Sequence, residues 1–269
     1  MEANHAFQVS GSAAESYEKY LVPVIFVPWA ENLLGRADLT PETRFLDVAC
    51  GTGIVARMAR ERIGPNGRIV GADVNPDMLR VARQLSDGAN IEWVQSDAAD
   101  MPLEDDSFDV LTIQQGLQFF PDKPAALAEC RRMLKPGGMA VMCMVATKEE
   151  NPLISAQVAA LEKKFGAQVS GAIRAVCGLS NADEIRDLFD GAGFSDVEIQ
   201  REALPLHHPD AVEFSAGFIL ATPAAGAIAA LPEDEQAQIV KDILEGFGDC
   251  FDGKALRFPH VSNVVTARA

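Results

Sequence analysis

The sequence lacks any run of about 18 consecutive apolar residues, so we expect no transmembrane helix. Its first residues, Met1–Phe7, lack a basic region followed by an apolar one, so we expect no signal peptide. There is no Cys-x-x-Cys pair, and the cysteines are widely spaced and odd in number: Cys50, Cys130, Cys143, Cys177 and Cys250. This pattern favours reduced, buried thiols in a cytoplasmic protein over disulfides, a metal site or a reactive thiol. We therefore predict a cytoplasmic location and no bound metal.

Positive charge is also scarce. The chain has 23 lysines and arginines against 39 aspartates and glutamates, a formal net charge of −16. A field of this sign repels phosphate backbones and anionic lipid, so we expect neither a nucleic-acid partner nor a membrane partner. Hydrophobic residues make up 48% of the 269 positions, which excludes general disorder and allows a large core. Long-range attraction would instead favour cations or neutral molecules, and a homodimer stays open.

From residue 43 onward, apolar runs alternate with amphipathic segments. The predicted strands are Arg44–Val48, Arg68–Asp73, Ile91–Gln95, Phe108–Gln114 and Met139–Val145. The predicted helices between them are Ile54–Ile63, Pro76–Leu85 and Lys123–Leu134. Strands that alternate with helices of this length indicate βαβ units, and therefore an α/β fold with a parallel sheet.

After Val145 the alternation loosens. We predict helices at Pro152–Phe165 and Ala182–Asp190, the second capped by Asn181, then a strand at Ser195–Gln200, helical structure over 207–254 and a last strand at Leu256–Arg268. We expect a single domain over residues 1–269. Its parts are a helical cap over 1–40, a core over 41–146, helical lid insertions over 147–180 and 202–254, and a terminal strand over 255–269.

The N-terminal stretch is rich in aromatic residues. Tyr17 and Tyr20 stand three apart, and Trp29 follows, with Pro23 and Pro28 expected to bend the segment. Two readings are equally open: the segment covers the substrate cleft, or it packs against the sheet as ordinary core.

The most informative stretch is Phe45–Gly53, which reads Phe-Leu-Asp-Val-Ala-Cys-Gly-Thr-Gly. An apolar strand ends beside Asp47, and Gly51 and Gly53 follow just before a helix. Glycines at such a turn let a ligand approach the backbone at a helix N-terminus. The pattern predicts a nucleotide-type ligand at this edge of the sheet.

Two more carboxylates close the next two strands. Asp73 lies 22 residues after Gly51, where it can accept both hydroxyls of a ribose. Asp97 closes the third strand and can accept an exocyclic purine amine. A single carboxylate at a strand end is as often a helix cap or a solvated loop, but three in register beside a glycine loop indicate a binding site.

Two cofactors compete for this site. Gly51-x-Gly53-x-x-Ala56 satisfies the dinucleotide fingerprint formally, so an NAD(P)-dependent oxidoreductase is one alternative. However, two phosphates fit poorly beside Asp47 and Asp73 in a chain of charge −16. S-adenosyl-L-methionine has no phosphate and carries a sulfonium and an ammonium group, so it fits better. A non-catalytic protein that binds this cofactor for regulation is a second alternative.

The chain resembles class I S-adenosylmethionine-dependent methyltransferases, in particular the small-molecule group around ubiquinone and menaquinone biosynthesis. The matching segments lie between about residues 40 and 146, in the family's order: Phe45–Gly53, Val70–Met78, Gln95–Ala98, Phe108–Leu111 and Leu134–Gly138. The resemblance implies a Rossmann-like sheet of seven strands, mostly parallel, with an antiparallel last strand and helices on both faces. One departure is Ala49, where many members have glycine.

The resemblance also implies roles for individual residues. Gly51 and Gly53 would line the methionine part of the cofactor, with Asp47 beside them. Asp73 would bind the ribose, Met78 would pack on the adenine, and Asp97 and Ala98 would contact its edge. Val74 is a further cofactor-binding candidate. Gln114 and Gln115 would face the methionine end and the methyl acceptor.

We expect methyl transfer to a small apolar or aromatic metabolite, through O, N or C. A general base is needed only for a hydroxyl or an acidic carbon, and the catalytic candidates are His207 and His208, with His260 more remote. Each lone histidine is more often structural. Candidate substrate-binding residues are Tyr17, Tyr20, Gln118 and Phe119, with Phe120 as a further apolar wall.

Overall fold

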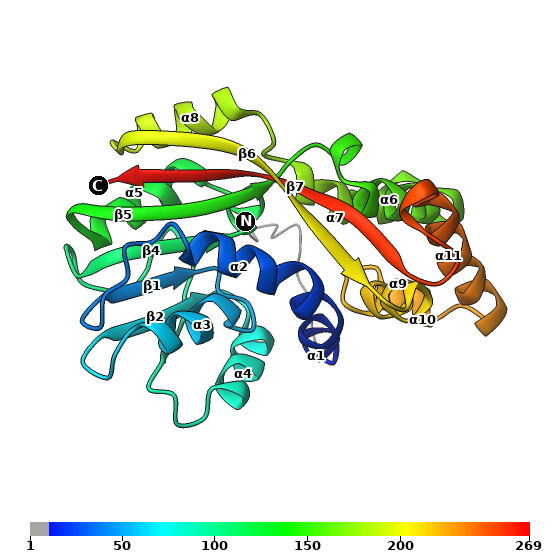
Figure 1. The fold of residues 1–269 in the computed structure, drawn as a ribbon, viewed down its shortest axis with the longest axis horizontal. Coiled ribbons are helices and arrows are strands. Elements are labelled where there is room, and N and C mark those ends of the chain that lie inside the picture. The colour runs from blue at the N-terminus through cyan, green and yellow to red at the C-terminus, as the bar shows by residue number, and fades with distance from the viewer. Residues whose placement is uncertain (1–10) are drawn as a thin grey trace.

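A computed structural model describes residues 11–269, with the side chains of residues 168 and 169 excepted. Its centre is one seven-stranded sheet of order β3-β2-β1-β4-β5-β7-β6 (Figure 1). The strands are β1 Arg44–Val48, β2 Arg68–Asp73, β3 Glu92–Gln95, β4 Phe108–Gln114, β5 Leu134–Val145, β6 Ser195–His208 and β7 Leu256–Arg268. Only β7 runs antiparallel to its neighbours, β5 and β6, among these strands. The predicted fold class is therefore confirmed, while the expected absence of a signal peptide and the start of the N-terminal cap lie outside the described residues.

Helices cover both faces of the sheet (Figure 1). The α-helices are α1 Ala13–Ser16, α2 Val27–Leu34, α3 Ile54–Arg62, α4 Pro76–Leu85, α5 Lys123–Met133, α6 Pro152–Phe165, α7 Ala167–Arg174, α8 Ala182–Gly191, α9 Ala211–Leu220, α10 Ala225–Ala229 and α11 Glu233–Gly246. A π-helix, η1 Tyr17–Phe26, joins α1 to α2, and short 3₁₀ turns are η2 Leu117–Phe119, η3 Lys148–Glu150, η4 Ala175–Cys177 and η5 Gly248–Cys250.

The period-two pattern of the strands divides the core between the two faces. Phe45 of β1 packs with α2 and α3, whereas its neighbour Leu46 packs with α5 and α8 on the other face. The predicted cap Asn181 holds the start of α8 by accepting bonds from the backbone N–H groups of Asp183 and Glu184. Local capping and strand alternation therefore place the helices as the sequence predicts.

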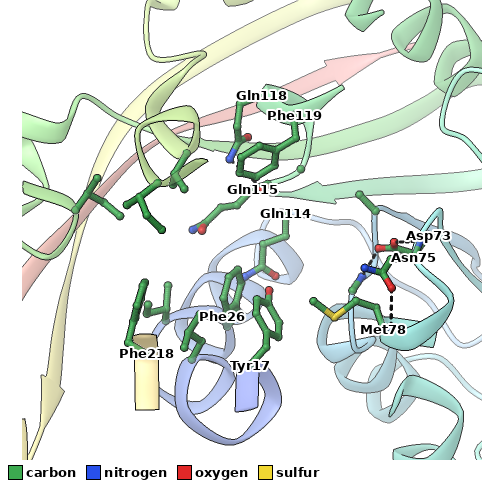
Figure 2. Close-up of a pocket in the computed structure, with 18 of the residues that line it drawn as sticks. Tyr17, Phe26, Asp73, Asn75, Met78, Gln114, Gln115, Gln118, Phe119 and Phe218 are labelled. Carbon is green, nitrogen blue, oxygen red and sulfur yellow. Dashed lines mark hydrogen bonds between the residues drawn. The ribbon is translucent and has the colours of Figure 1, made fainter. Parts of the chain in front are cut away.

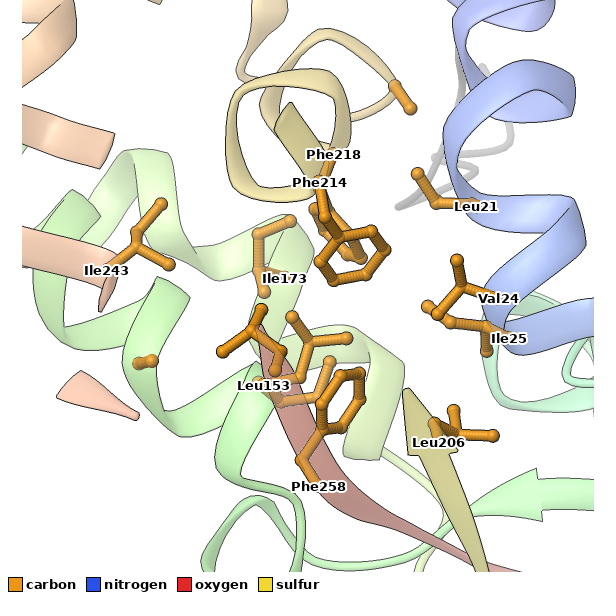
Figure 3. Packing of buried hydrophobic residues seen from close by; sticks show 14 of the residues in the cluster. Leu21, Val24, Ile25, Leu153, Ile173, Leu206, Phe214, Phe218, Ile243 and Phe258 are labelled. Atoms are coloured by element: carbon orange, nitrogen blue, oxygen red, sulfur yellow. The ribbon is translucent and has the colours of Figure 1, made fainter. Parts of the chain in front are cut away.

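The outer half of the β6–β7 pair extends past the other strands and carries the lid helices (Figure 1). There α6, α7, α9 and α11 form a second cluster in which Leu153, Ile173 and Phe218 pack toward Leu21 and Ile25 of η1 (Figure 3). Ile239 and Ile243, four residues apart on one face of α11, are buried in this cluster.

Two strands are longer than predicted. β5 begins at Leu134 rather than Met139, because a register shift against β4 lets Lys135–Gly138 continue the strand. β6 runs to His208 rather than Gln200, so the second helical segment begins at Ala211. β6 is a largely exposed edge strand that tolerates Pro205, so its apolar alternation is weak.

The N-terminal helix serves both of the roles that its aromatic residues left open. Trp29 is fully buried in the core, while Tyr17 lies at the cleft described below. The segment around Pro23 winds as a π-helix, in which the missing N–H of proline is accommodated by wider hydrogen bonding.

The cysteines are free thiols. Cys50, Cys130 and Cys143 are buried, and Cys177 and Cys250 are half-buried. Burial raises the pKa of Cys130 and Cys143 to about 12, so these groups stay protonated. Within residues 11–269, no helix is long and apolar enough to cross a membrane, and no cluster of three metal-ligating side chains is found.

Candidate functional site

The glycine loop between β1 and α3 is held by backbone hydrogen bonds. The Cys50 N–H donates to Ala72 O at 3.0 Å, and the Gly53 N–H donates to Cys50 O at 2.8 Å. Gly51 has φ +55°, a left-handed conformation that favours glycine. A Cβ at Gly51 would lie 3.9 Å from the Tyr17 hydroxyl, so η1 closes over the loop. The loop thus exposes backbone to a cleft under the N-terminal helix.

Gly53 lies on the side of the loop that faces Trp93 and not in the cleft lining. It precedes α3 with φ +82°, and a Cβ there would lie 2.2 Å from Cη2 of Trp93. Gly53 has a structural role, because only glycine fits between the start of α3 and the indole. Its contact with the ligand stays a prediction.

Asp73 ties the glycine loop to β2. Its carboxylate accepts the Gly51 N–H on Oδ2 and the Asn75 N–H on Oδ1, both at 2.8 Å. A carboxylate accepts up to about four hydrogen bonds, so holding the loop and binding a ribose are compatible roles. Asn75 in turn caps α4 by accepting the Asp77 and Met78 N–H groups, which fixes Met78 at the cleft.

Asp47 is behind the loop rather than in the cleft. It is 1% exposed, accepts the Thr112 hydroxyl at 2.8 Å and bonds the Ala56 backbone, while its Oδ2 has no partner in the described part of the chain. Burial raises the pKa of Asp47 from 3.8 to about 7, against the two hydrogen bonds, which lower it. We infer that Asp47 supports the loop from within the core and that its carboxyl group is largely protonated below about pH 7.

Asp47→Asn should change how stability depends on pH. A pKa raised in the folded state gives a stabilising contribution that is complete below about pH 4 and lost as pH rises through about 7. Asparagine does not titrate, so the variant does not lose this contribution. The free energy of unfolding of the variant minus that of the wild type should therefore rise by up to about 4 kcal/mol between about pH 4 and about pH 7. Urea unfolding of both proteins at several pH values measures the gain; a difference that is independent of pH would exclude a neutral buried Asp47.

A small apolar recess lies beyond Asp73, on the β3 side. Its polar rim is made by Asp73, Ser96 and Asp97, and its walls include Ala98 and Phe120. Asp97 is exposed, and its Oδ1 accepts the Ala99 N–H at 2.9 Å. The recess has the apolar faces and the carboxylate edge that an adenine ring requires.

The main cleft is continuous with this recess and occupies about 1090 Å³, its open mouth included. It is lined by Tyr17, Leu21, Ile25, Phe26, Ala49, Gly51, Asp73, Val74, Asn75, Met78, Gln114, Gln115, Gly116, Gln118, Phe119, Phe120, Leu153, Ile154, Ile173, Val176, Phe218 and His260. Asp73, Asn75 and Met78 lie at one side and Phe218 at the other, with Tyr17 and the glutamines between them (Figure 2). None of these described lining residues is a lysine or an arginine, so the cleft offers no side-chain cation to a phosphate.

Three glutamines present amide groups between the side of the cleft that holds Asp73 and the side that holds Phe218 (Figure 2). Gln114 donates to Phe26 O at 2.8 Å, and Gln118 donates to Gln115 O at 3.0 Å. Gln114 Oε1, Gln115 Nε2 and Gln118 Oε1 are buried without a partner among the described residues. Gln115 also has φ +52°, a strained conformation for a side chain of this size. Strain and unpaired amides at one place are typical of a ligand site.

Besides Asp47 and Gly53, three predicted site residues do not line the cleft or its recess. His207 and His208 are the last two residues of β6, in the outer half of the β6–β7 pair. There His208 stacks on Phe214 and accepts the Asp210 N–H. The sequence predicts helical structure from residue 207 onward, whereas β6 continues to His208 and places both histidines outside the cleft lining. Tyr20 packs against Gly217 of α9, because residues three apart in the wide π-helix face different ways.

The remaining predicted residues do line the cleft or its recess: Tyr17, Gly51, Asp73, Val74, Met78, Asp97, Ala98, Gln114, Gln115, Gln118 and Phe119. His260, which we expected to be remote, lines the cleft as well. Its signal was available in the alternation of β7, where Phe258, His260 and Val264 share one face and the first and last are in the lid-side core.

The fold and the site define a class I S-adenosylmethionine-dependent methyltransferase. A model of the ubiE/COQ5 methyltransferase family matches residues 24–204. Demethylmenaquinone methyltransferase of Staphylococcus carnosus (strain TM300) is 32% identical over 185 residues, which are 64% of this chain and 76% of that protein. The protein of the same name from Staphylococcus aureus (strain JH9) is 31% identical over the same length.

This chain belongs to the ubiE/COQ5 methyltransferase family. It is therefore an S-adenosylmethionine-dependent enzyme, and neither the oxidoreductase nor the regulatory alternative is retained.

Solved structures agree on the fold. Phosphoethanolamine N-methyltransferase 2 of Haemonchus contortus, bound to S-adenosylmethionine, matches with a TM-score of 0.62 at 20% identity, over 95% of this chain and 56% of that one. The cyclase SpnF matches with a TM-score of 0.58 at 21% identity, over 90% and 80%. Because a cyclase shares the fold, the acceptor must be argued from the site.

Proposed function

We propose that this enzyme transfers the methyl group of S-adenosylmethionine to a small apolar or aromatic metabolite. The observation that carries the proposal is the composition of the half of the cleft that lies away from Asp73. Its walls come from η1, α6, α7 and α9, and their side chains are apolar: Leu21, Ile25, Leu153, Ile154, Ile173 and Phe218. A pocket of this kind binds an apolar ring and excludes a strongly hydrated group.

The other half fits the cofactor. In our assignment, Asp73 binds the ribose hydroxyls, Val74 and Met78 pack on the adenine, and Asp97 with Ala98 contacts its edge. Gly51, with its left-handed backbone, leaves room for the methionine part. The absence of side-chain cations among the described lining residues suits a ligand with an ammonium and a sulfonium in place of phosphates.

When bound, the cofactor supplies a methyl group on a good leaving group, so the protein contributes mainly position. Gln114, held by Phe26 O, and Gln115, held by its backbone bond to Cys143 O, lie at the boundary of the two halves. Their amides orient the acceptor and the positive end of the cofactor. Tyr17 of η1 covers this boundary with a neutral hydroxyl group. Burial, with the charge of Asp73 adding to it, raises the pKa of the Tyr17 phenol well above the ordinary value.

The relatives indicate which acceptors to try first. Demethylmenaquinone methyltransferases, by their name, methylate an apolar quinone-type molecule, which agrees with the apolar wall. The phosphoethanolamine enzyme shares only the fold, and this cleft has no lysine or arginine in its described lining for such a phosphate.

Transfer of a deuterium-labelled methyl group to a panel of acceptors tests the proposal. Naphthols and reduced naphthoquinones should acquire the label, whereas phosphoethanolamine and histamine should not. Phe218→Asn should lower turnover of the aromatic acceptors by about tenfold or more, because it places an amide in the apolar wall. Leu220→Asn changes an exposed residue of the same helix and should leave turnover unchanged. Label found only on the charged amines would refute an apolar acceptor.

A further inference from the structure

A buried tryptophan stands behind His260, a histidine that lines the cleft. Trp29 of α2 is fully buried, and its Nε1–H donates to Nδ1 of His260 on β7 at 3.0 Å. The two rings meet edge to face with centroids 5.9 Å apart. His260 is 2% exposed and lines the cleft.

The tryptophan fixes the tautomer of the histidine. Indole Nε1 can only donate, so Nδ1 of His260 must accept and carries no proton. Burial lowers the pKa of His260 to about 4, so the ring is neutral near pH 7 and its one proton is on Nε2. His260 is therefore a hydrogen-bond donor at Nε2 and cannot take a proton there as a base.

The surroundings leave this donor without a partner. Nε2 has no hydrogen bond to any residue in the described part of the chain, and it is not among the fully buried unpaired atoms, so it is open to the cleft. The lining of that cleft includes the apolar side chains of Leu153, Ile173 and Phe218. The other titratable groups of the cleft lining are Tyr17, on η1, and Asp73, in the cofactor half. An unpaired donor in an apolar wall costs free energy that a ligand oxygen can recover.

We propose that the Nε2–H of His260 donates a hydrogen bond to an oxygen of the methyl acceptor. This assigns the acceptor to a narrower class than apolarity alone: apolar molecules that carry a carbonyl, ether or phenolate oxygen at the end held by β7. The inference rests on the proposed function, since it concerns the same half of the cleft. His260 is a specificity-determining residue here, and Trp29 is a positioning residue that acts through it.

Binding of two naphthalenes of the same shape tests this assignment. 1-Acetylnaphthalene has a carbonyl oxygen, and 1-isopropenylnaphthalene has a methylene group in its place on the same trigonal carbon. In the presence of S-adenosylhomocysteine, the wild type should bind the ketone about tenfold more tightly, because the hydrocarbon leaves Nε2–H unpaired. His260→Phe should reduce this preference to within about twofold, and His260→Gln, which retains an N–H donor, should restore part of it.

The readout is the ratio of the two affinities, which a general loss of packing would not change selectively. Trp29→Phe, which frees Nδ1 to take the proton, should lower the ratio without abolishing binding of S-adenosylhomocysteine. Equal binding of both ligands by the wild type, or an unchanged ratio in His260→Phe, would overturn the role of His260 alone. Failure of the wild type to bind either naphthalene while it binds S-adenosylhomocysteine would overturn the apolar acceptor site itself.

Discussion

Asp73→Ala should abolish measurable binding of S-adenosylmethionine. In the structure Asp73 lines both the main cleft and the adenine-sized recess, and it also holds the Gly51 N–H at 2.8 Å. A hydrogen bond to a charged group contributes about 1.5–3 kcal/mol. Loss of the two bonds assigned to the ribose therefore predicts a decrease in affinity of about 10² to 10⁴-fold, with loosening of the glycine loop in addition.

Calorimetry with S-adenosylhomocysteine measures this loss. Asp87→Ala is the matched control, because it removes the same charge from an exposed position just after α4 and should bind like the wild type. Asp97→Ala should weaken binding less than Asp73→Ala, since Asp97 is exposed at the rim of the recess. Affinity of Asp73→Ala within about threefold of the wild type would show that the ribose assignment is wrong.

Gly71→Ala should destabilise the fold strongly although alanine suits a strand. Gly71 pairs with Trp93 on β3, and a Cβ there would lie 2.2 Å from Cζ3 of the indole and 3.2 Å from Cys50 Sγ. The backbone of Gly71 is not left-handed, so steric overlap is the main cost. Overpacking of a well-filled site costs about 1–3 kcal/mol, and we expect the upper end of this range from urea unfolding.

A double-mutant cycle isolates the contact with the indole. In a Trp93→Leu background, Gly71→Ala should cost less than about 1 kcal/mol, so the coupling between the two positions should be large. Gly53→Ala and Gly88→Ala give a second comparison, because both glycines have positive φ but only Gly53 has Trp93 within reach. If all three glycine variants lost the same stability, the indole would not be the cause.

Most of the cofactor half could be predicted from sequence because it depends on local chemistry. The turn at Gly51 and the carboxylate of Asp73 lie at the ends of β1 and β2, next to the helices that follow these strands. The family resemblance also implied an antiparallel last strand, and β7 agrees with it to the residue. The glycine-to-alanine departure proved informative, since Ala49 is left-handed with φ +53°.

The acceptor half depends on contacts between distant segments, which no local pattern encodes. His260 meets Trp29 across 231 positions of the chain, and β6 continues to His208 in register with β7. Asp47 was predicted to face the ligand, but a strand residue one position from the end points where the pleat directs it, here toward Thr112. His207 and His208, the predicted candidates for a base, are therefore not part of the cleft lining, whereas the buried His260 is.

The central claim is that one cleft holds cofactor and acceptor on opposite sides of Gln114 and Gln115. A crystal structure with S-adenosylhomocysteine and the best acceptor from the labelling panel tests it most directly. The account predicts the ribose on Asp73, the acceptor ring between Ile173 and Phe218, and an acceptor oxygen on His260 Nε2. An acceptor bound outside the lid helices, or adenosine placed among the apolar side chains of α6 and α9, would contradict it.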